Sequence, residues 1–146
     1  MNVQMKITVF NRRLGSDRRD MFFPCCITSA SYYEVKSSSH DTDGNRSEKL
    51  SYKLRIPYNA ITQDSRTYVS AAAYKLLTAG EAMQHWTIQK GDIVLTRETA
   101  LEEPIDKTAL QALVRSSCCD VITITEYADN TIRGTDAVKH WRIGGE

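Results

Sequence analysis

The stretch Leu50-Ser-Tyr-Lys-Leu-Arg-Ile-Pro57 alternates apolar and polar side chains with a period of two residues. Successive side chains of a strand point to opposite faces of its sheet, so this period predicts a strand with one buried and one wet face. The buried face is expected to carry Leu50, Tyr52, Leu54 and Ile56. This is the clearest strand signal in the chain, and it makes a sheet the starting point for the fold.

Segments upstream of this strand carry a similar signal. In residues 5–9 the apolar side chains alternate with Lys6 and Thr8, which are expected on the wet face. Residues 21–35 are rich in aromatic and β-branched side chains and predict a second strand. Because proline cannot donate a ladder hydrogen bond, Pro24 makes this an edge strand or a bulged one.

Strands are also predicted downstream. Residues 86–95, Trp86-Thr-Ile-Gln-Lys-Gly-Asp-Ile-Val-Leu95, predict a hairpin whose tight turn takes a positive φ from Gly91. Residues 118–127 and 137–143 predict two closing strands that pair as antiparallel neighbours.

Two segments have helical character. Ser70 is suited to cap a short helix over residues 70–79, and Gly80 fits its end. Apolar side chains recur at helical spacing over residues 104–117, after a proline suited to a first turn. With about seven strands and no regular βα alternation, the expected fold class is mainly β. We predict a small antiparallel β-barrel or sandwich with long loops and one or two short inserted helices.

Length and charge narrow the class further. A chain of 146 residues has the size of one domain, and residues 1–146 are predicted to form a single β-rich domain. Its formal charge of +1 argues against a dedicated nucleic-acid or anionic-membrane binder, which needs a concentrated positive field. No segment has the roughly 18 apolar residues that span a bilayer. The N-terminal residues lack the pattern of a secretory signal, so we expect synthesis in a cytoplasm.

Two polar segments stand out against this background. Residues 36–49 have no apolar side chains to offset the entropy of ordering, and they predict a mobile polar hairpin tip. Residues 11–20 contain four arginines together with turn-forming residues, and they predict a solvated loop. The arginines form the one local positive field of the chain.

The histidines and the acidic residues do not form a catalytic constellation. His85 and His140 each precede a tryptophan, and we expect exposed histidines beside buried tryptophans; pH sensing and metal ligation stay open as alternatives. Residues 41–45, Asp-Thr-Asp-Gly-Asn, resemble the start of a calcium loop. Tyr52 stands where such a loop needs its bidentate glutamate, which argues against calcium.

The four cysteines form two adjacent pairs, Cys25-Cys26 and Cys118-Cys119. Adjacent pairs are rare in disulfide frameworks, so we expect reduced thiols. Zinc-binding pairs are normally separated by two to four residues, which argues against a four-thiolate zinc site. A nucleophilic couple of Cys25 or Cys118 with a histidine stays open. We expect no catalytic residue, no metal and no cofactor.

Five motifs follow one another along the chain: Ile7-Thr-Val-Phe-Asn11, Tyr52-Lys-Leu-Arg-Ile-Pro57, residues 86–95, Val121-Ile-Thr-Ile-Thr-Glu-Tyr127 and Trp141-Arg-Ile143. Their order resembles small structural proteins of the head–tail module of tailed phages and prophages of Gram-positive bacteria, and the wider group of head-closure, or stopper, proteins. The resemblance implies a small β-barrel with long loops, copies of which form a ring around the DNA channel beneath the portal and adaptor. Residues 37–49 would then be a long hairpin loop that contacts neighbouring rings or the channel.

These observations favour a non-enzymatic structural component of a phage virion neck, forming a ring that joins head and portal to the tail. A tail terminator or other tail-end component is the alternative, and a cysteine-dependent enzyme or thiol switch is an alternative of a different class. Expected partners are further copies of the chain and neighbouring neck proteins such as portal, adaptor or tail terminator, with DNA only passing through the channel and no membrane. The expected intersubunit or DNA-channel contacts are Arg12, Arg13, Arg18, Arg19, His40, Asp41, Asp43 and Arg46.

Overall fold

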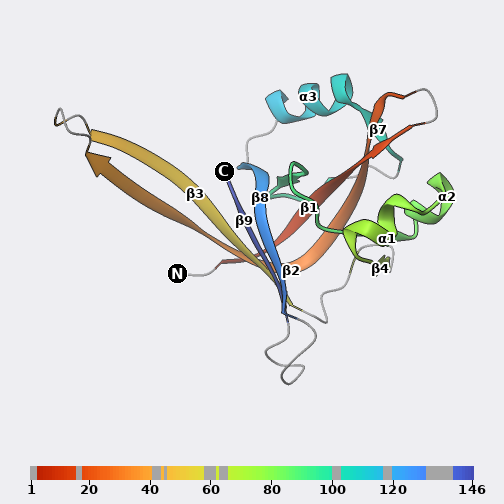
Figure 1. The fold of residues 1–146 in the computed structure, drawn as a ribbon, viewed down its shortest axis with the longest axis horizontal. Coiled ribbons are helices and arrows are strands. Elements are labelled where there is room, and N and C mark those ends of the chain that lie inside the picture. Colours follow the sequence, from red (N-terminus) through yellow and green to blue (C-terminus); the bar gives the residue numbers. More distant parts are fainter. Residues whose placement is uncertain are drawn as a thin grey trace.

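The structure is a computed structural model of the chain, and it describes residues 3–15, 18–40, 44, 46–57, 62, 66–99, 103–116, 120–130 and 140–146. Strands account for most of its regular structure (Figure 1). The strands are β1 (Val3–Leu14), β2 (Asp20–His40), β3 (Arg46–Pro57), β4 (Thr67–Tyr68), β5 (His85–Trp86), β6 (Ile93–Leu95), β7 (Ile105–Asp106), β8 (Val121–Asn130) and β9 (His140–Gly145). The helices are α1 (Ala71–Lys75), α2 (Ala79–Ala82) and α3 (Lys107–Ser116).

Seven strands form one antiparallel sheet in the order β1-β6-β8-β9-β3-β2-β7, and β1 also pairs with β2. The sheet curls around the core, but its pairings are staggered along the strands. β8 pairs with β6 through residues 121–123 and with β9 from Ile124 onward, so successive neighbours meet it at different levels. The mainly β, antiparallel fold with a few short helices is confirmed, and the sheet is not a closed barrel.

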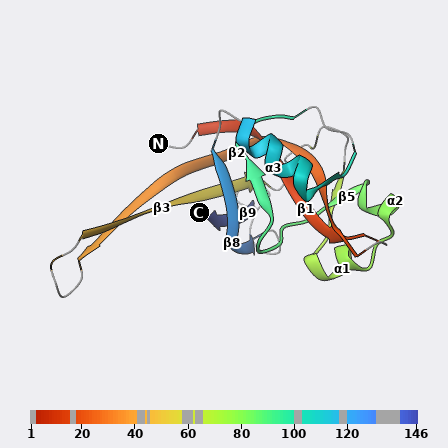
Figure 2. The ribbon, with the colours of Figure 1, turned by 90° about the horizontal axis from the view of Figure 1, so that it is seen from above.

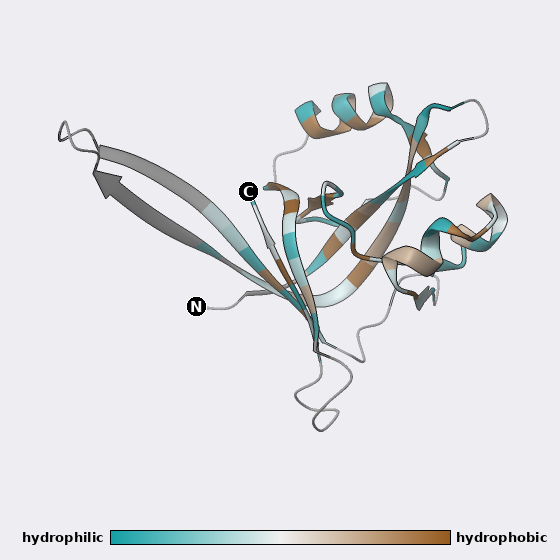
Figure 3. Ribbon diagram, in the orientation of Figure 1, coloured by the Kyte–Doolittle hydropathy of each residue, from teal (hydrophilic) through white to brown (hydrophobic). Residues whose placement is uncertain are grey.

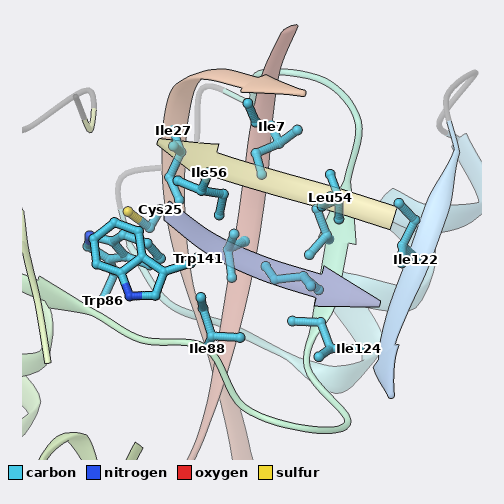
Figure 4. Packing of buried hydrophobic residues seen from close by; sticks show 14 of the residues in the cluster. Ile7, Cys25, Ile27, Leu54, Ile56, Trp86, Ile88, Ile122, Ile124 and Trp141 are labelled. Atoms are coloured by element: carbon cyan, nitrogen blue, oxygen red, sulfur yellow. The ribbon is translucent and has the colours of Figure 1, made fainter. Parts of the chain in front are cut away.

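The main core lies inside this curl and is built from the alternating positions of several strands (Figure 4). In β3 the predicted alternation is confirmed at Tyr52, Leu54 and Ile56, which are buried, whereas the side chain of Leu50 lies outside what the structure describes. Register pairs Leu54 with Ile143 and Ile56 with Trp141, so the apolar positions of β3 and β9 are direct neighbours. Apolar positions on both strands therefore face the same core.

An aromatic cluster closes one end of the core. Trp86 and Trp141 meet edge to face with ring centroids 5.2 Å apart, and Tyr68 lies 4.6 Å from Trp141. Both tryptophans are buried, as expected, whereas His85 and His140 are half-buried and not exposed as predicted.

Both faces of β1 are buried from Ile7 to Asn11, which the alternation did not predict, while Lys6 is exposed as expected. Thr8, expected on the wet face, is fully buried, because the segment after β6 covers it and its hydroxyl donates to the carbonyl of Arg97 at 2.8 Å. Further along β1, Phe10 packs with Leu110 of α3 in a second apolar cluster. Figure 3 shows the hydrophobic side of α3 turned toward the sheet. The predicted amphipathic helix is thereby confirmed, but it starts at Lys107, where Asp106 accepts the N–H of Ala109 at 2.8 Å. Pro104 lies before β7 and not in the first turn of the helix, so the role predicted for it is wrong.

The other helical segment is interrupted. Ser70 caps α1 as predicted, accepting the N–H of Ala73 at 3.2 Å. The helix ends by Leu76, however, and α2 begins at Ala79, after the N-cap residue Thr78, whose capping box with Glu81 satisfies free backbone groups. Gly80 therefore lies inside α2, and its predicted role as a helix end is wrong.

The predicted hairpin over residues 86–95 is also wrong, although its turn exists. Gly91 has φ of 89°, as the turn requires. The flanking strands diverge, because β5 pairs in parallel with β4 whereas β6 pairs with β1 and β8. The turn thus connects two different sheets.

The outer parts of β2 and β3 form a two-stranded arm that leaves the body (Figures 1 and 2). Its pairs run from Ser31↔Arg55 to His40↔Arg46, so the strands reach well into the polar segment predicted as a loop tip. An antiparallel pair satisfies its backbone hydrogen bonds from within, which is how polar residues can form a ladder. We call the paired residues 33–40 and 46–53 the arm.

A bulge lies where the arm meets the body. Between the pairs Met5↔Ala30 and Ile7↔Ile27, two residues of β2 face one of β1. One of the two is Ser29, whose φ of 63° is rare for a residue with a side chain. Bulges of this kind bend a strand and increase its twist.

Candidate functional site

The predicted contact residues fall into two groups at separate places in the fold. Arg12 and Arg13 lie on β1, which continues to Leu14 instead of giving way to the predicted loop. Arg18 and Arg19 are exposed in the turn that follows, where Gly15 donates its N–H to the carbonyl of Arg19 at 2.7 Å. The turn is shorter than predicted because pairing with β2 extends β1.

The second group belongs to the arm. His40 and Arg46 are paired in register at the outer end of β2 and β3. Asp41 and Asp43 lie outside the described residues. The structure therefore places the four arginines of residues 12–19 on the body, and it places His40 and Arg46 on the arm.

Arg13 is half-buried and makes its contacts within the fold, whereas the sequence placed it among the expected contacts with other subunits or DNA. Its guanidinium donates to the carbonyl oxygens of Tyr74 and Thr78 at 3.4 Å and also to that of Leu77. It stacks on the rings of Phe23 and Tyr74, at 5.6 and 5.2 Å from the ring centroids. A cation at carbonyl groups left open by a helix end is favourable, so Arg13 fastens α1 and the start of α2 to β1.

Arg12 points to a different environment, a surface depression between β1, α1 and the turn before β6. One part of it has a volume of about 410 Å³ and another about 380 Å³, and both are lined by Arg12, Lys75 and Gln89. We call this depression the basic hollow. The remaining lining residues are Arg13, Leu14, Asp20, Ala71, Lys90, Asp92 and Tyr127.

A buried carboxylate forms the floor of the basic hollow. Asp92 is 1% exposed, and its Oδ1 accepts the backbone N–H of Arg12 at 3.2 Å. Its Oδ2 accepts from the side-chain amides of Asn11 at 2.9 Å and Gln89 at 3.0 Å. Burial raises the pKa of Asp92 to about 6, and these hydrogen bonds oppose the rise without cancelling it.

Asn11 extends the network into the core. Its amide donates to the carbonyl of Thr87 at 2.7 Å, and its Oδ1 accepts the N–H of Thr87 at 3.1 Å. The main chain of Asp92 also accepts the N–H of Ile124 at 2.9 Å. The network thus ties β1, the turn before β6 and β8 together beneath the hollow.

The described cysteines do not look like nucleophiles. Cys25 and Cys26 are buried and reduced. Burial raises the pKa of Cys26, and the nearby Glu98 carboxylate raises it further. Reactive cysteines need the opposite shift, because the thiolate is the nucleophile. Cys118 and Cys119 lie outside the described residues.

Two further features concern metal ions and membranes, in the part of the chain that the structure describes. There, no group of three or more His, Cys, Asp and Glu side chains is placed to hold a metal ion. No helix among the same residues is long and apolar enough to cross a membrane.

Sequence reasoning missed Lys75, Lys90 and Asp92. The lysines come from segments distant from Arg12, and a single sequence carries no signal of that proximity. Asp92 was assigned to a turn next to Gly91, which is correct for its backbone. The available signal for its burial was Asn11, a polar residue within the apolar run of β1.

Comparison with curated proteins and with solved structures gives no significant match. One family matches, and its match extends over residues 2–146, nearly the whole chain. The chain therefore belongs to the family of unknown function DUF6751.

Proposed function

We propose that the protein is a non-enzymatic structural subunit of a phage virion neck, which assembles into a ring joining head and portal to the tail. The observation that carries this proposal is the arm, which leaves the body of the fold (Figure 2). An extended polar hairpin contributes little to its own core and is suited to reach a neighbouring subunit.

The edges of the arm support this use. Among the described residues, β2 beyond Tyr32 pairs only with β3, and β3 before Tyr52 pairs only with β2. Each strand therefore offers one row of backbone N–H and C=O groups that a neighbouring chain can pair with. A contact between the arm of one copy and the body of the next is heterologous, and heterologous contacts close into rings when the rotation between copies permits.

The arm does not distinguish a neck position from a tail position, whereas the cysteine-based alternative receives less support. A tail terminator or other tail-end component would use the same arm and differs in its place in the virion. A cysteine-dependent enzyme needs a thiolate, and the raised pKa of Cys26 opposes one at that position.

A trimmed arm tests the proposal. Register pairs Lys36 with Leu50, so an Asn-Gly turn replacing residues 37–49 closes the hairpin without changing the remaining pairs. Electron microscopy and light scattering should show rings for the full chain and monomers for the trimmed chain, with circular dichroism confirming that both are folded. Rings that persist after trimming would show that the arm does not make the contacts between subunits.

Location in the particle tests the second part. Labelling of virions should place the protein between head and tail, whereas a label at the top of the tail tube favours a tail terminator. A protein that stays monomeric at all concentrations and is absent from particles contradicts both structural assignments.

A further inference from the structure

We propose that the basic hollow binds phosphate groups of a nucleic-acid backbone. The inference stands on the body of the fold and does not depend on the arm. Its ligand would be the phosphodiester chain itself, without reading of the bases, because the cations of the hollow are suited to phosphate oxygens.

Three exposed cations converge on the hollow from separate elements. Arg12 comes from β1, Lys75 from the last position of α1, and Lys90 from the turn before β6. Within the described residues none of the three forms a salt bridge. Elsewhere on the surface lysines do find carboxylates, as in Lys53–Glu126 at 2.7 Å. The hollow therefore presents cations that the described residues do not hold in salt bridges, although the charge of Arg12 acts on Asp92 and that of Lys90 on Glu126.

The charge balance of the hollow differs from that of the chain. Its lining holds four cations, which are Arg12, Arg13, Lys75 and Lys90, against two carboxyl groups, which are Asp20 and Asp92. A formal charge of +2 thus gathers in one depression of a chain whose total is +1. Local concentration of this kind attracts phosphate even where the net field is small.

The acid at the floor feels the charge of Arg12, which opposes the rise that burial causes in the pKa of Asp92, but among the described residues no salt bridge joins Asp92 to the cations of the hollow. Asp92 is buried, and both of its oxygens already accept hydrogen bonds, from the N–H of Arg12 and from the amides of Asn11 and Gln89. The amide of Gln89 is fixed in turn by the carbonyl of Arg12 at 3.2 Å. The floor is held in place, while the long cationic side chains above it remain available.

The spread of the cations favours a chain of phosphates over a single ion. The three exposed cations come from separate segments around the hollow, and Arg18 is exposed in the turn that follows β1. Cations spread over a surface can meet successive phosphates of a backbone. Because few phosphates are neutralised, binding should be weak and should fall steeply as salt increases.

Anisotropy of a fluorescent 20-base-pair duplex at low salt tests the inference. The wild-type protein is compared with the double variant Arg12→Ala/Lys75→Ala and with Lys107→Ala/Arg115→Ala, which removes the same charge from exposed positions of α3. We expect the hollow variant to lose affinity by about 10-fold or more and its salt slope to fall by about 2, at about 0.9 per phosphate contact. The α3 variant should lose less than about 3-fold.

Three results would overturn the inference. Equal losses in the two variants would mean that affinity follows net charge and not the hollow. No binding by the wild-type protein at low salt would remove the site. The third result comes from a titration with inorganic phosphate that is followed by NMR. Phosphate binding at Arg12 and Lys75 without duplex binding would assign the hollow to a small anion. Ring formation is measured separately, so failure here leaves the proposed assembly function intact.

Discussion

The burial of Asp92 predicts that protonation of one side chain stabilises the fold. The pKa of this carboxyl lies at about 6 in the folded protein and at 3.8 in an exposed aspartate. The folded state therefore holds the proton more tightly than the unfolded state over the window between these values. Stability contributed by Asp92 is fully present below pH 3.8 and is lost as the pH rises through 6.

The magnitude follows from the shift. Each pKa unit corresponds to about 1.36 kcal/mol, so a rise from 3.8 to about 6 gives an amplitude of about 3 kcal/mol. About 2.5 kcal/mol of this should be lost between pH 4 and pH 7. The direction is opposite to ordinary acid denaturation, in which paired carboxylates lose their stabilising charge as the pH falls.

Urea denaturation at several pH values measures the effect against a matched variant. Asp92→Asn removes the titration at nearly constant volume, and all other ionisable groups cancel when the two free energies of unfolding are subtracted. We expect the advantage of the wild-type protein over the variant to shrink by about 2.5 kcal/mol from pH 4 to pH 7. A ¹³C titration of the Asp92 carboxyl gives an independent value in the wild-type protein.

Two results would refute this reasoning. A difference between wild type and variant that does not change with pH would show that burial does not control the proton. A carboxyl that titrates below pH 4 would show that the donors from Asn11, Gln89 and Arg12 outweigh the loss of hydration.

Other variants test the contacts around the hollow and the buried thiols. Arg13→Ala should lower the free energy of unfolding by about 2 kcal/mol, because three carbonyl groups and two rings lose a cation. Arg12→Ala, at an exposed side chain, should change it by no more than about 0.5 kcal/mol, and equal effects of the two variants in urea denaturation would contradict the structural role of Arg13. Gly91→Ala should destabilise the fold by about 1–2 kcal/mol because of the positive φ, although there is open space for a Cβ at this position. Gly80→Ala, inside α2, should stabilise the fold by about 0.5–1 kcal/mol, and thermal melting that shows the same sign for both variants would be inconsistent with these two backbone conformations. With Cys118 and Cys119 changed to serine, the native protein should show no thiol that reacts quickly with an alkylating reporter at neutral pH, and a fast thiol would restore the cysteine-based hypothesis.

Periodicity predicted the strands that face a single core. The apolar positions of β3 are buried as their spacing indicates, and β8 and β9 pair as antiparallel neighbours. The same reasoning failed at Thr8, because a covering segment distant in sequence buries the second face of β1. Alternation shows which residues share a face of a strand, but not what lies against either face.

Local signals also misplaced connections. The turn at Gly91 is real, yet the strands on its two sides pair with different partners, since their hydrogen bonds are decided by distant segments. Thr78 and Glu81 carry the spacing of a capping box, which competes with Gly80 as a signal for where one helix ends and the next begins.

The candidate site was partly predictable. The cluster of arginines drew attention to Arg12, which lines the hollow, and to Arg13, whose charge is used inside the fold. Exposure was inferred from polarity alone, and polarity does not distinguish a solvated arginine from one that caps a helix. Lys75 and Lys90 enter only through the tertiary structure.

The bulge at Ser29 fixes the direction in which the arm leaves the body. β2 is continuous from the body into the arm, so no loop joins the two. The bend lies at Ser29, a single residue with φ of 63°. Such an arm keeps its direction relative to the body, unlike a segment on a flexible linker. Changing that direction requires distortion of a strand that is paired on both sides of the bend. In a ring of identical copies, the angle between successive subunits would then follow from that bend. The number of copies would be a property of the strand's geometry.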